Sequence, residues 1–144
     1  MSLIMSIHKQ YCDAILSGTK TIELRKSAPS EIKLPFKVYM YETLQKGGCG
    51  KLVGEFICSE IIKTDLFSIV NRYLNKTEDN LLRTEYAKKI CLSLEDIYTY
   101  AGNHKFLYLY KIEKYRKYNS PINLSELGLR YAPISWQIYR KEKK

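Results

Sequence analysis

Lys20, Glu23 and Arg25 are three ionisable residues within one short stretch of the chain. A lysine acts as a base or nucleophile only after losing a proton, and a neighbouring carboxylate such as Glu23 favours the charged ammonium instead. The planar fork of Arg25 can grip a phosphate or a base edge, while Glu23 can accept from an exocyclic amine or a ribose hydroxyl. The trio therefore favours an electrostatic site that holds a ligand. The alternative is an ion-pair ladder on an exposed sheet face, which would contribute under about 1 kcal/mol.

A helix followed by a strand must position these groups. Apolar residues recur at helical spacing over 11–16, and Gly18 can take the left-handed conformation that ends a helix. From Lys20 onward the pattern alternates, which predicts a half-buried strand with Glu23 and Arg25 on its polar face. Strict alternation puts Lys20 on the other face. All three share a cleft only if Lys20 lies in the turn before the strand or beside a bulge.

The rest of the chain alternates between strand and helix patterns. Further strands are predicted at 37–42, 52–62, 105–115 and 136–139, with a bulge at Gly54 and a turn-rich stretch over 120–133. Residues 65–101 instead have helical spacing, with Thr64, Thr77 and Ser93 as expected N-caps and Gly102 as the expected stop. Strands at both ends with helices between them predict a small mixed-sheet barrel that carries a helical insert.

Length and composition predict one domain spanning residues 1–144. Of the 144 residues, 45% are hydrophobic, which suffices for a core, and no apolar run is long enough to cross a membrane. The N-terminus lacks the features of a secretory signal, so the cytoplasm is the expected location. The four cysteines form no Cys-x-x-Cys pair and only two histidines are present, so neither a metal nor a cofactor is expected.

The formal charge of +9 is concentrated towards the two ends of the chain. Residues 1–53 carry 8 basic and 4 acidic side chains, residues 54–100 carry 6 and 8, and residues 101–144 carry 10 and 3. Such a distribution suits a polyanion such as RNA, because phosphate contacts release condensed counterions. The alternative is that the C-terminal lysines are only a solvated tail.

Thirteen tyrosines offer possible stacking surfaces for bases. Four of them alternate or interleave with basic residues in one stretch: Tyr108, Tyr110, Tyr115 and Tyr118. Packing in the core is the competing interpretation for each. Trp136 is expected to be a core or rim anchor, with Ser135 facing the cleft beside it.

Three other features are weaker. His8 begins the first helix and is a candidate binding residue, although a lone histidine is often an ordinary helix-start residue. Residues 47–51 lack the first glycine and the Ser or Thr of a phosphate-binding loop, so they predict a turn. Glu95 and Asp96 could act as distant acids, but a helix start also explains them.

In this order the elements resemble the ASCH family, a branch of the PUA-like superfamily. The resemblance rests on the opening Met5–Ile7 strand, Gly18-x-Lys20-x-x-Glu23-x-Arg25, the strand ending Tyr41-Glu42, Val53-Gly54-Glu55-Phe56, Ser120-Pro121-Ile122 and Leu127-Gly128. It covers almost the whole chain. It implies an α+β fold, a PUA-like mixed β-barrel of five or six strands with an N-terminal helix, and a cleft that receives Lys20, Glu23 and Arg25.

The resemblance also implies candidate functions. Members are proposed to bind RNA or to act as coactivator-associated modules, which makes a nonenzymatic RNA- or nucleotide-binding domain the leading hypothesis, with Lys20, Glu23, Arg25, His8 and Ser135 as ligand-binding residues. One branch is similar to an amidohydrolase that deacetylates N4-acetylcytidine with the signature lysine and a threonine three residues later. Glu23 replaces that threonine here. The alternative is therefore an amidohydrolase with Lys20 and Glu23 as catalytic residues, and a third hypothesis is a module that binds an acidic protein partner. The oligomeric state is not predicted.

Overall fold

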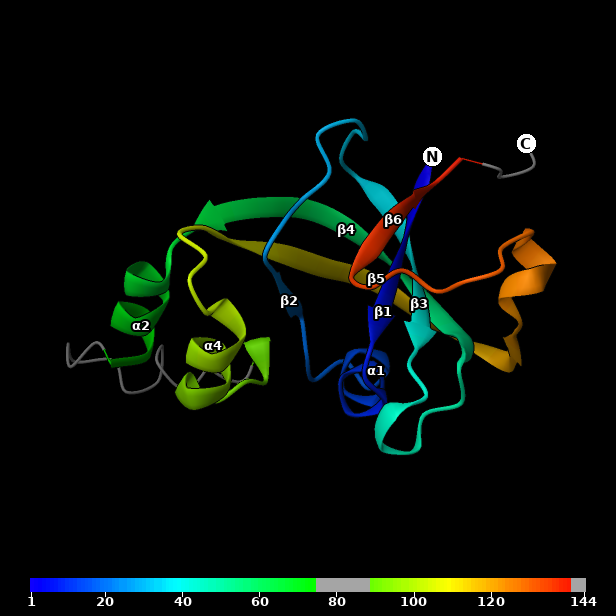
Figure 1. Ribbon diagram of the computed structural model, residues 1–144, viewed down its shortest axis with the longest axis horizontal. Helices are drawn as coiled ribbons and strands as arrows, with labels where there is room; N and C mark the ends of the chain where they lie inside the picture. Colours follow the sequence, from blue (N-terminus) through cyan, green and yellow to red (C-terminus); the bar gives the residue numbers. More distant parts are fainter. Residues whose placement is uncertain (75–88, 141–144) are drawn as a thin grey trace.

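The computed structural model describes residues 1–74 and 89–140. Their elements, labelled as in Figure 1, are β1 (Ser2–Ile7), α1 (Lys9–Leu16), β2 (Ile22–Arg25), β3 (Phe36–Glu42), the 3-10 turn η1 (Gln45–Gly47), β4 (Lys51–Thr64), α2 (Leu66–Leu74), α4 (Leu94–Ala101), β5 (Leu107–Ile122), η2 (Leu124–Leu127) and β6 (Trp136–Tyr139). Strands at both ends of the chain bracket the helical insert, as predicted. No helix in the described ranges is long and apolar enough to cross a membrane.

The six strands form one curled sheet, a half-barrel whose strand order is β2-β5-β4-β3-β1-β6 (Figure 1). The β1–β3 pair is parallel and the other pairs are antiparallel, so the sheet is mixed. The predicted α+β fold of five or six strands with an N-terminal helix is confirmed, and the number of strands in the sheet is six. β5 is longer than predicted and reaches Ile122, because its ladder with β4 continues to the pair Leu52–Ile122.

The main core lies between the sheet and α1. Alternate residues of β3 face it, and α1 contributes Cys12 and Ile15. The helix approaches the sheet closely at Gly54, where a Cβ would lie 2.6 Å from the carbonyl oxygen of Arg116 and 2.9 Å from Leu16 Cδ2. The β4–β5 register shifts at the same place, which confirms the predicted bulge. Glycine at this position therefore lets α1 pack onto the half-barrel.

A second core joins the helical insert to the sheet. Ile69 of α2 and Ile97 of α4 are buried against Leu24 and Leu109, which are direct partners in the β2–β5 ladder. Figure 1 shows both helices beside the end of the β4–β5 ribbon. The insert thus packs on one face of β2, and Glu23 and Arg25 lie on the opposite face.

The caps of the insert helices are partly as predicted. Ser93 caps α4, because its hydroxyl accepts from the backbone N–H of Asp96 at 3.0 Å, and Gly102 ends the helix with φ of 53°. The expected cap at Thr64 is wrong. Thr64 is the last residue of β4, and Asp65 accepts from the N–H of Ser68 at 2.7 Å instead, because a carboxylate one position later is an equally good cap. The predicted cap Thr77 lies outside the described residues.

Candidate functional site

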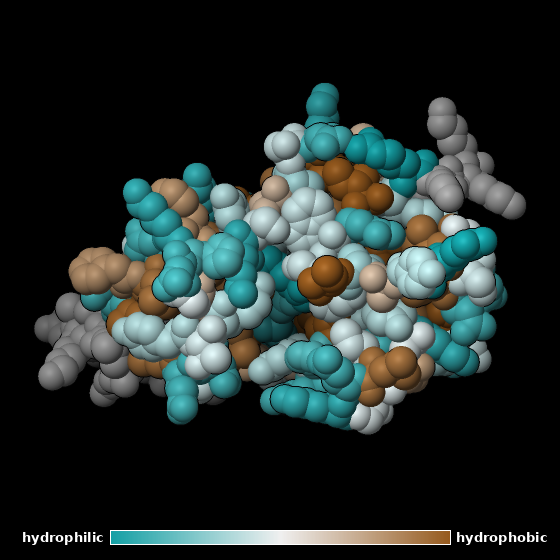
Figure 2. Space-filling model, in the orientation of Figure 1, coloured by the Kyte–Doolittle hydropathy of each residue, from teal (hydrophilic) through white to brown (hydrophobic). Residues whose placement is uncertain are grey.

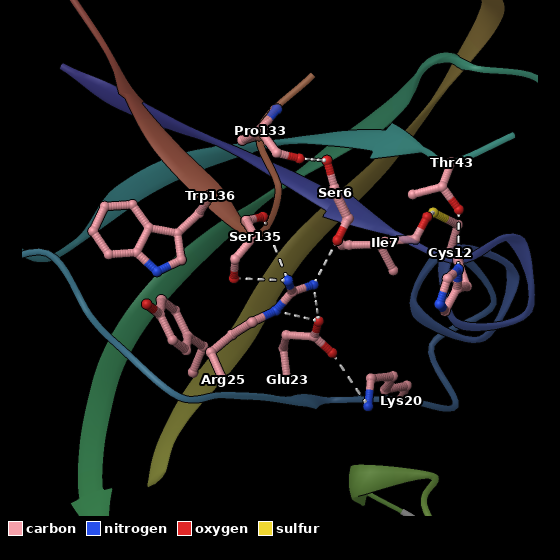
Figure 3. Close-up of polar contacts among 12 residues, drawn as sticks. Ser6, Ile7, Cys12, Lys20, Glu23, Arg25, Thr43, Pro133, Ser135 and Trp136 are labelled. Carbon is pink, nitrogen blue, oxygen red and sulfur yellow. Dashed lines mark hydrogen bonds and ion pairs between the residues drawn. The ribbon is translucent and has the colours of Figure 1, made fainter. Parts of the chain in front are cut away.

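Arg25 joins the two edges of the half-barrel. Its Nε donates to Glu23 Oε2 at 2.9 Å, and its Nη2 donates to the same oxygen and to the carbonyl of Ser6 in β1 at 2.8 Å. Its Nη1 donates to the hydroxyl of Ser135 at 3.2 Å and to its carbonyl at 3.4 Å, just before β6 (Figure 3). A guanidinium has five N–H groups, and these contacts use all of them. Arg25 therefore fixes the site rather than offering donors to a ligand.

Trp136 reinforces the same junction. Its indole nitrogen lies 3.0 Å from the hydroxyl and 3.2 Å from the carbonyl oxygen of Ser27, two positions after the end of β2. Tyr110 also donates to the Ser27 carbonyl, at 2.7 Å. The prediction that Trp136 anchors a rim is consistent with this position between β6 and the end of β2.

Lys20 lies in the turn before β2, the position that lets it share a cleft with Glu23 and Arg25. Only 1% of Lys20 is exposed. Its ammonium donates to the carbonyl of Ile90, lies 3.4 Å from Glu23 Oε1, and sits 5.2 Å from the centre of the Tyr11 ring. Lys20, Glu23 and Arg25 are therefore a buried cluster of two cations around one carboxylate.

Glu23 remains ionised because its two cationic neighbours outweigh its burial. Desolvation by itself would raise the pKa of this carboxyl, but Arg25 and then Lys20 hold the pKa below its ordinary value. The buried cluster carries a formal charge of +1. An exposed ion-pair ladder, the alternative from the sequence, does not describe these side chains, of which the most exposed is 10% accessible.

The helical insert completes the site from the other side. The Thr21 N–H donates to the carbonyl of Lys89 at 2.9 Å, and the next residue, Ile90, accepts from Lys20. These contacts connect the turn before β2 to a segment about 70 residues away. The segment continues into α4, two of whose side chains reach the same space.

A cavity of about 650 Å³ opens beside the buried cluster. In Figure 2 the surface is hollowed between the helical insert and the half-barrel. Its lining includes Lys20, Glu23 and Arg25, the tyrosines Tyr11, Tyr41 and Tyr100, His8 and Thr43, and Leu92 and Asp96. A volume of this order is typical of small-ligand sites.

His8 and Ser135 have different relations to the cavity. His8 lines it from the N-cap position of α1, and its Nδ1 lies 3.0 Å from the hydroxyl of Thr43. Ser135 contacts Arg25 and is not among the lining residues. Ser135 thus holds Arg25 in place from outside the cavity.

Sequence reasoning did not place α4 and the segment just before it at the cavity, although it had named Asp96 as a possible distant acid. Leu92, Asp96 and Tyr100 line the cavity, and Tyr11 lines it from α1. Asp96 was explained by helix capping, yet only its backbone N–H makes the cap, which leaves its carboxylate for other contacts. No local sequence signal marks Tyr100, because its position depends on how the insert folds back.

The tyrosines of β5 are not gathered at this cavity. Tyr110 and Tyr118 are buried, at 0% and 8% exposure, so they pack in the core and do not offer surfaces for base stacking. Tyr115 is 46% exposed and touches the turn at Gly18 rather than the cavity. No tyrosine of β5 lines the cavity in the described part of the chain.

No group of three or more His, Cys, Asp or Glu side chains that could hold a metal ion occurs within the residues described. Cys12, Cys49 and Cys58 are free thiols, and burial raises the pKa of the Cys58 thiol to about 12 and that of Cys12 well above its usual range.

Comparison with known proteins gives the class of this fold. No protein-family model and no curated protein matches the sequence. Three crystal structures of the ASCH protein of Zymomonas mobilis, two of them of single-residue variants, match the structure with a TM-score of 0.75. They are 20–21% identical to this chain and cover 97% of it and 88–91% of their own chains. The chain thus has the PUA-like fold of the ASCH structures, and the expected fold is confirmed.

Proposed function

We propose that this chain binds a nucleotide, free or as one unit of a single-stranded RNA, in the cavity beside the buried cluster. The observation that carries the proposal is the combination of an open space of about 650 Å³, three tyrosine rings and a fixed ionic wall. Aromatic rings can stack on any base, and polar side chains at fixed positions orient the bound molecule. The chain's formal charge of +9 also favours a polyanionic ligand.

The environment of Lys20 supports binding rather than lysine catalysis. Its ammonium donates to the Ile90 carbonyl and lies beside the Glu23 carboxylate. A catalytic lysine needs the lone pair of its nitrogen, and these acceptors occupy the ammonium instead. We therefore assign Lys20 and Glu23 to the structure and charge of the binding wall.

Tyr100 and Tyr98 provide a matched pair of variants. Both lie on α4, but Tyr100 lines the cavity whereas Tyr98 is 52% exposed and does not line it. Tyr100→Leu keeps an apolar side chain in the insert core while removing the ring. Stacking contributes about 1–3 kcal/mol per base, so Tyr100→Leu should weaken binding at least fivefold while Tyr98→Leu leaves it unchanged.

The test is equilibrium binding of fluorescent mixed-sequence RNA and of the four ribonucleoside monophosphates, at about 50 and about 200 mM salt. Binding of RNA and monophosphates that is lost in Tyr100→Leu supports the proposal; RNA binding without monophosphate binding assigns the ligand to a strand. The proposal would be overturned if neither RNA nor a monophosphate bound, or if an acidic peptide, and no nucleotide, displaced the bound RNA. Hydrolysis of N4-acetylcytidine that disappears in Lys20→Arg would replace it with the amidohydrolase alternative.

A further inference from the structure

Asp96 is the one carboxylate on the described cavity wall that has no cationic partner. Glu23 is held by Lys20 and Arg25, whereas no ion pair involves Asp96 among residues 1–74 and 89–140. Its backbone N–H serves the helix cap with Ser93, so its two carboxylate oxygens stay open. An ionised carboxylate only accepts hydrogen bonds. The cavity lining therefore includes a pure acceptor, on the same helix as Tyr100.

Arg25 and Lys20, the two cations in the described cavity lining, form no ion pair with the Asp96 carboxylate. Every N–H of Arg25 already has a protein acceptor, and Lys20 is buried against Ile90 and Glu23. Asp96 is close enough to Tyr11 that burial, followed by the Asp96 and Glu23 carboxylates, raises the pKa of the Tyr11 phenol. Tyr11 thus remains a protonated donor in the lining of the same cavity.

A bound base would have to satisfy this arrangement along one edge. The Watson–Crick edge of guanine has two adjacent donors, its ring N1–H and its 2-amino group, followed by the O6 acceptor. Adenine and cytosine have a ring acceptor beside their single amino donor, and uracil has one donor between two carbonyl oxygens. Only guanine therefore matches both oxygens of a carboxylate without placing an acceptor against it.

We infer that the cavity is specific for guanine nucleotides, with Asp96 accepting from N1–H and the 2-amino group and Tyr11 donating to O6. This inference rests on the proposed function and names the base. Charge-assisted hydrogen bonds are stronger than neutral ones, so loss of one should weaken binding by about tenfold or more. Specificity thus depends on a side chain of the insert rather than on the Lys20, Glu23 and Arg25 signature.

The experiment compares GMP with IMP, which lacks only the 2-amino group, and with AMP. Each is titrated into the wild type, Asp96→Asn and Glu95→Gln. Glu95 is the matched control because it is the adjacent acidic residue of α4 and does not line the cavity. Asp96→Asn keeps the backbone cap, and thermal unfolding of all three proteins checks that the fold is retained.

The wild type and Glu95→Gln should bind GMP about tenfold or more tightly than IMP or AMP, and Asp96→Asn should bring the GMP:IMP ratio close to one. Equal binding of GMP and IMP by the wild type, or an unchanged ratio in Asp96→Asn, overturns the inference while the proposed function stands. Absence of binding by any monophosphate or RNA overturns both.

Discussion

Within residues 1–74 and 89–140, two clusters of one lysine, one glutamate and one arginine lie in opposite environments. The buried cluster lies at the edge of the cavity. The outer cluster lies across β3, β4 and β5, where Lys37 is 3.5 Å and Arg116 2.9 Å from the Glu55 carboxylate. Side-chain exposure is 36% for Lys37, 13% for Glu55 and 66% for Arg116, against 1–10% in the buried cluster. The residue types are the same, and water access is the main difference.

Both carboxyls are charged at neutral pH, but for different reasons. Burial opposes ionisation of Glu55, and the hydroxyl of Tyr118 together with the two cations brings the pKa of that carboxyl below its ordinary value. In the outer cluster, water can replace a lost partner. In the buried cluster a lost partner leaves a desolvated charge, so its loss should be far more costly.

Glu23→Gln is the variant that should separate the clusters most strongly. It removes the only carboxylate between two buried cations while keeping the side-chain shape. We expect a loss of about 3–5 kcal/mol in the free energy of unfolding, measured by urea denaturation. A loss no larger than that of Glu55→Gln would show that the two clusters are equivalent.

Arg25→Lys should have the next largest effect, although it keeps the charge. An ammonium has three donors and no planar fork, so it cannot serve Glu23, Ser6 and Ser135 together. We expect a loss of about 2 kcal/mol, with faster hydrogen exchange in β6 than in β3. The matched change at the outer cluster, Arg116→Lys, should alter neither measurement; equal exchange rates in β6 of both variants would argue against a joining role for Arg25.

The pH dependence of stability should also identify the buried carboxyl. Its pKa is lower in the folded state than the ordinary value of 4.5, so its ionisation stabilises the fold fully above about pH 4.5 and progressively less as the pH falls through the folded pKa. The difference in unfolding free energy between wild type and Glu23→Gln should therefore be constant from pH 5 to 7 and shrink below about pH 4.5. If the difference in unfolding free energy grew on acidification, the pKa of Glu23 would have to be raised in the folded state and not lowered.

The contacts that the sequence could predict are the local ones. The helix stop at Gly18 and the alternation after Lys20 depend on residues within one turn or one strand, and they placed Glu23 and Arg25 on one face of a strand. The sequence leaves open whether Lys20 lies in the turn before that strand or beside a bulge, and the structure places it in the turn before β2. The order of strands and helices follows from the same periodicity. These patterns therefore sufficed for the fold class, while Lys20, Glu23 and Arg25 as ligand-binding residues stay a prediction.

The unpredicted contacts join distant segments. Ser135 meets Arg25 across 110 positions, and Ile90 meets Lys20 across 70. Asp96 reaches the cavity only because the insert packs on β2 and β5. Hydrophobic periodicity shows which face of an element is buried, but it does not show which distant segment covers that face. The pairing of Glu55 with Arg116 has the same origin, since the β4–β5 ladder shifts register on both sides of this pair.

Glu55→Gln should have the smallest effect, and its salt dependence is the sharper test. The exposed pairs of the outer cluster should contribute under about 1 kcal/mol at low salt, and less at about 0.5 M salt, because mobile ions screen charges that water can reach. The penalty of Glu23→Gln should change little over the same range, since counterions cannot enter the buried cluster. Urea denaturation of both variants at the two salt concentrations measures this difference directly. Parallel salt responses would mean that water reaches Glu23, and the ionic wall of the cavity would then be as screened as the outer surface.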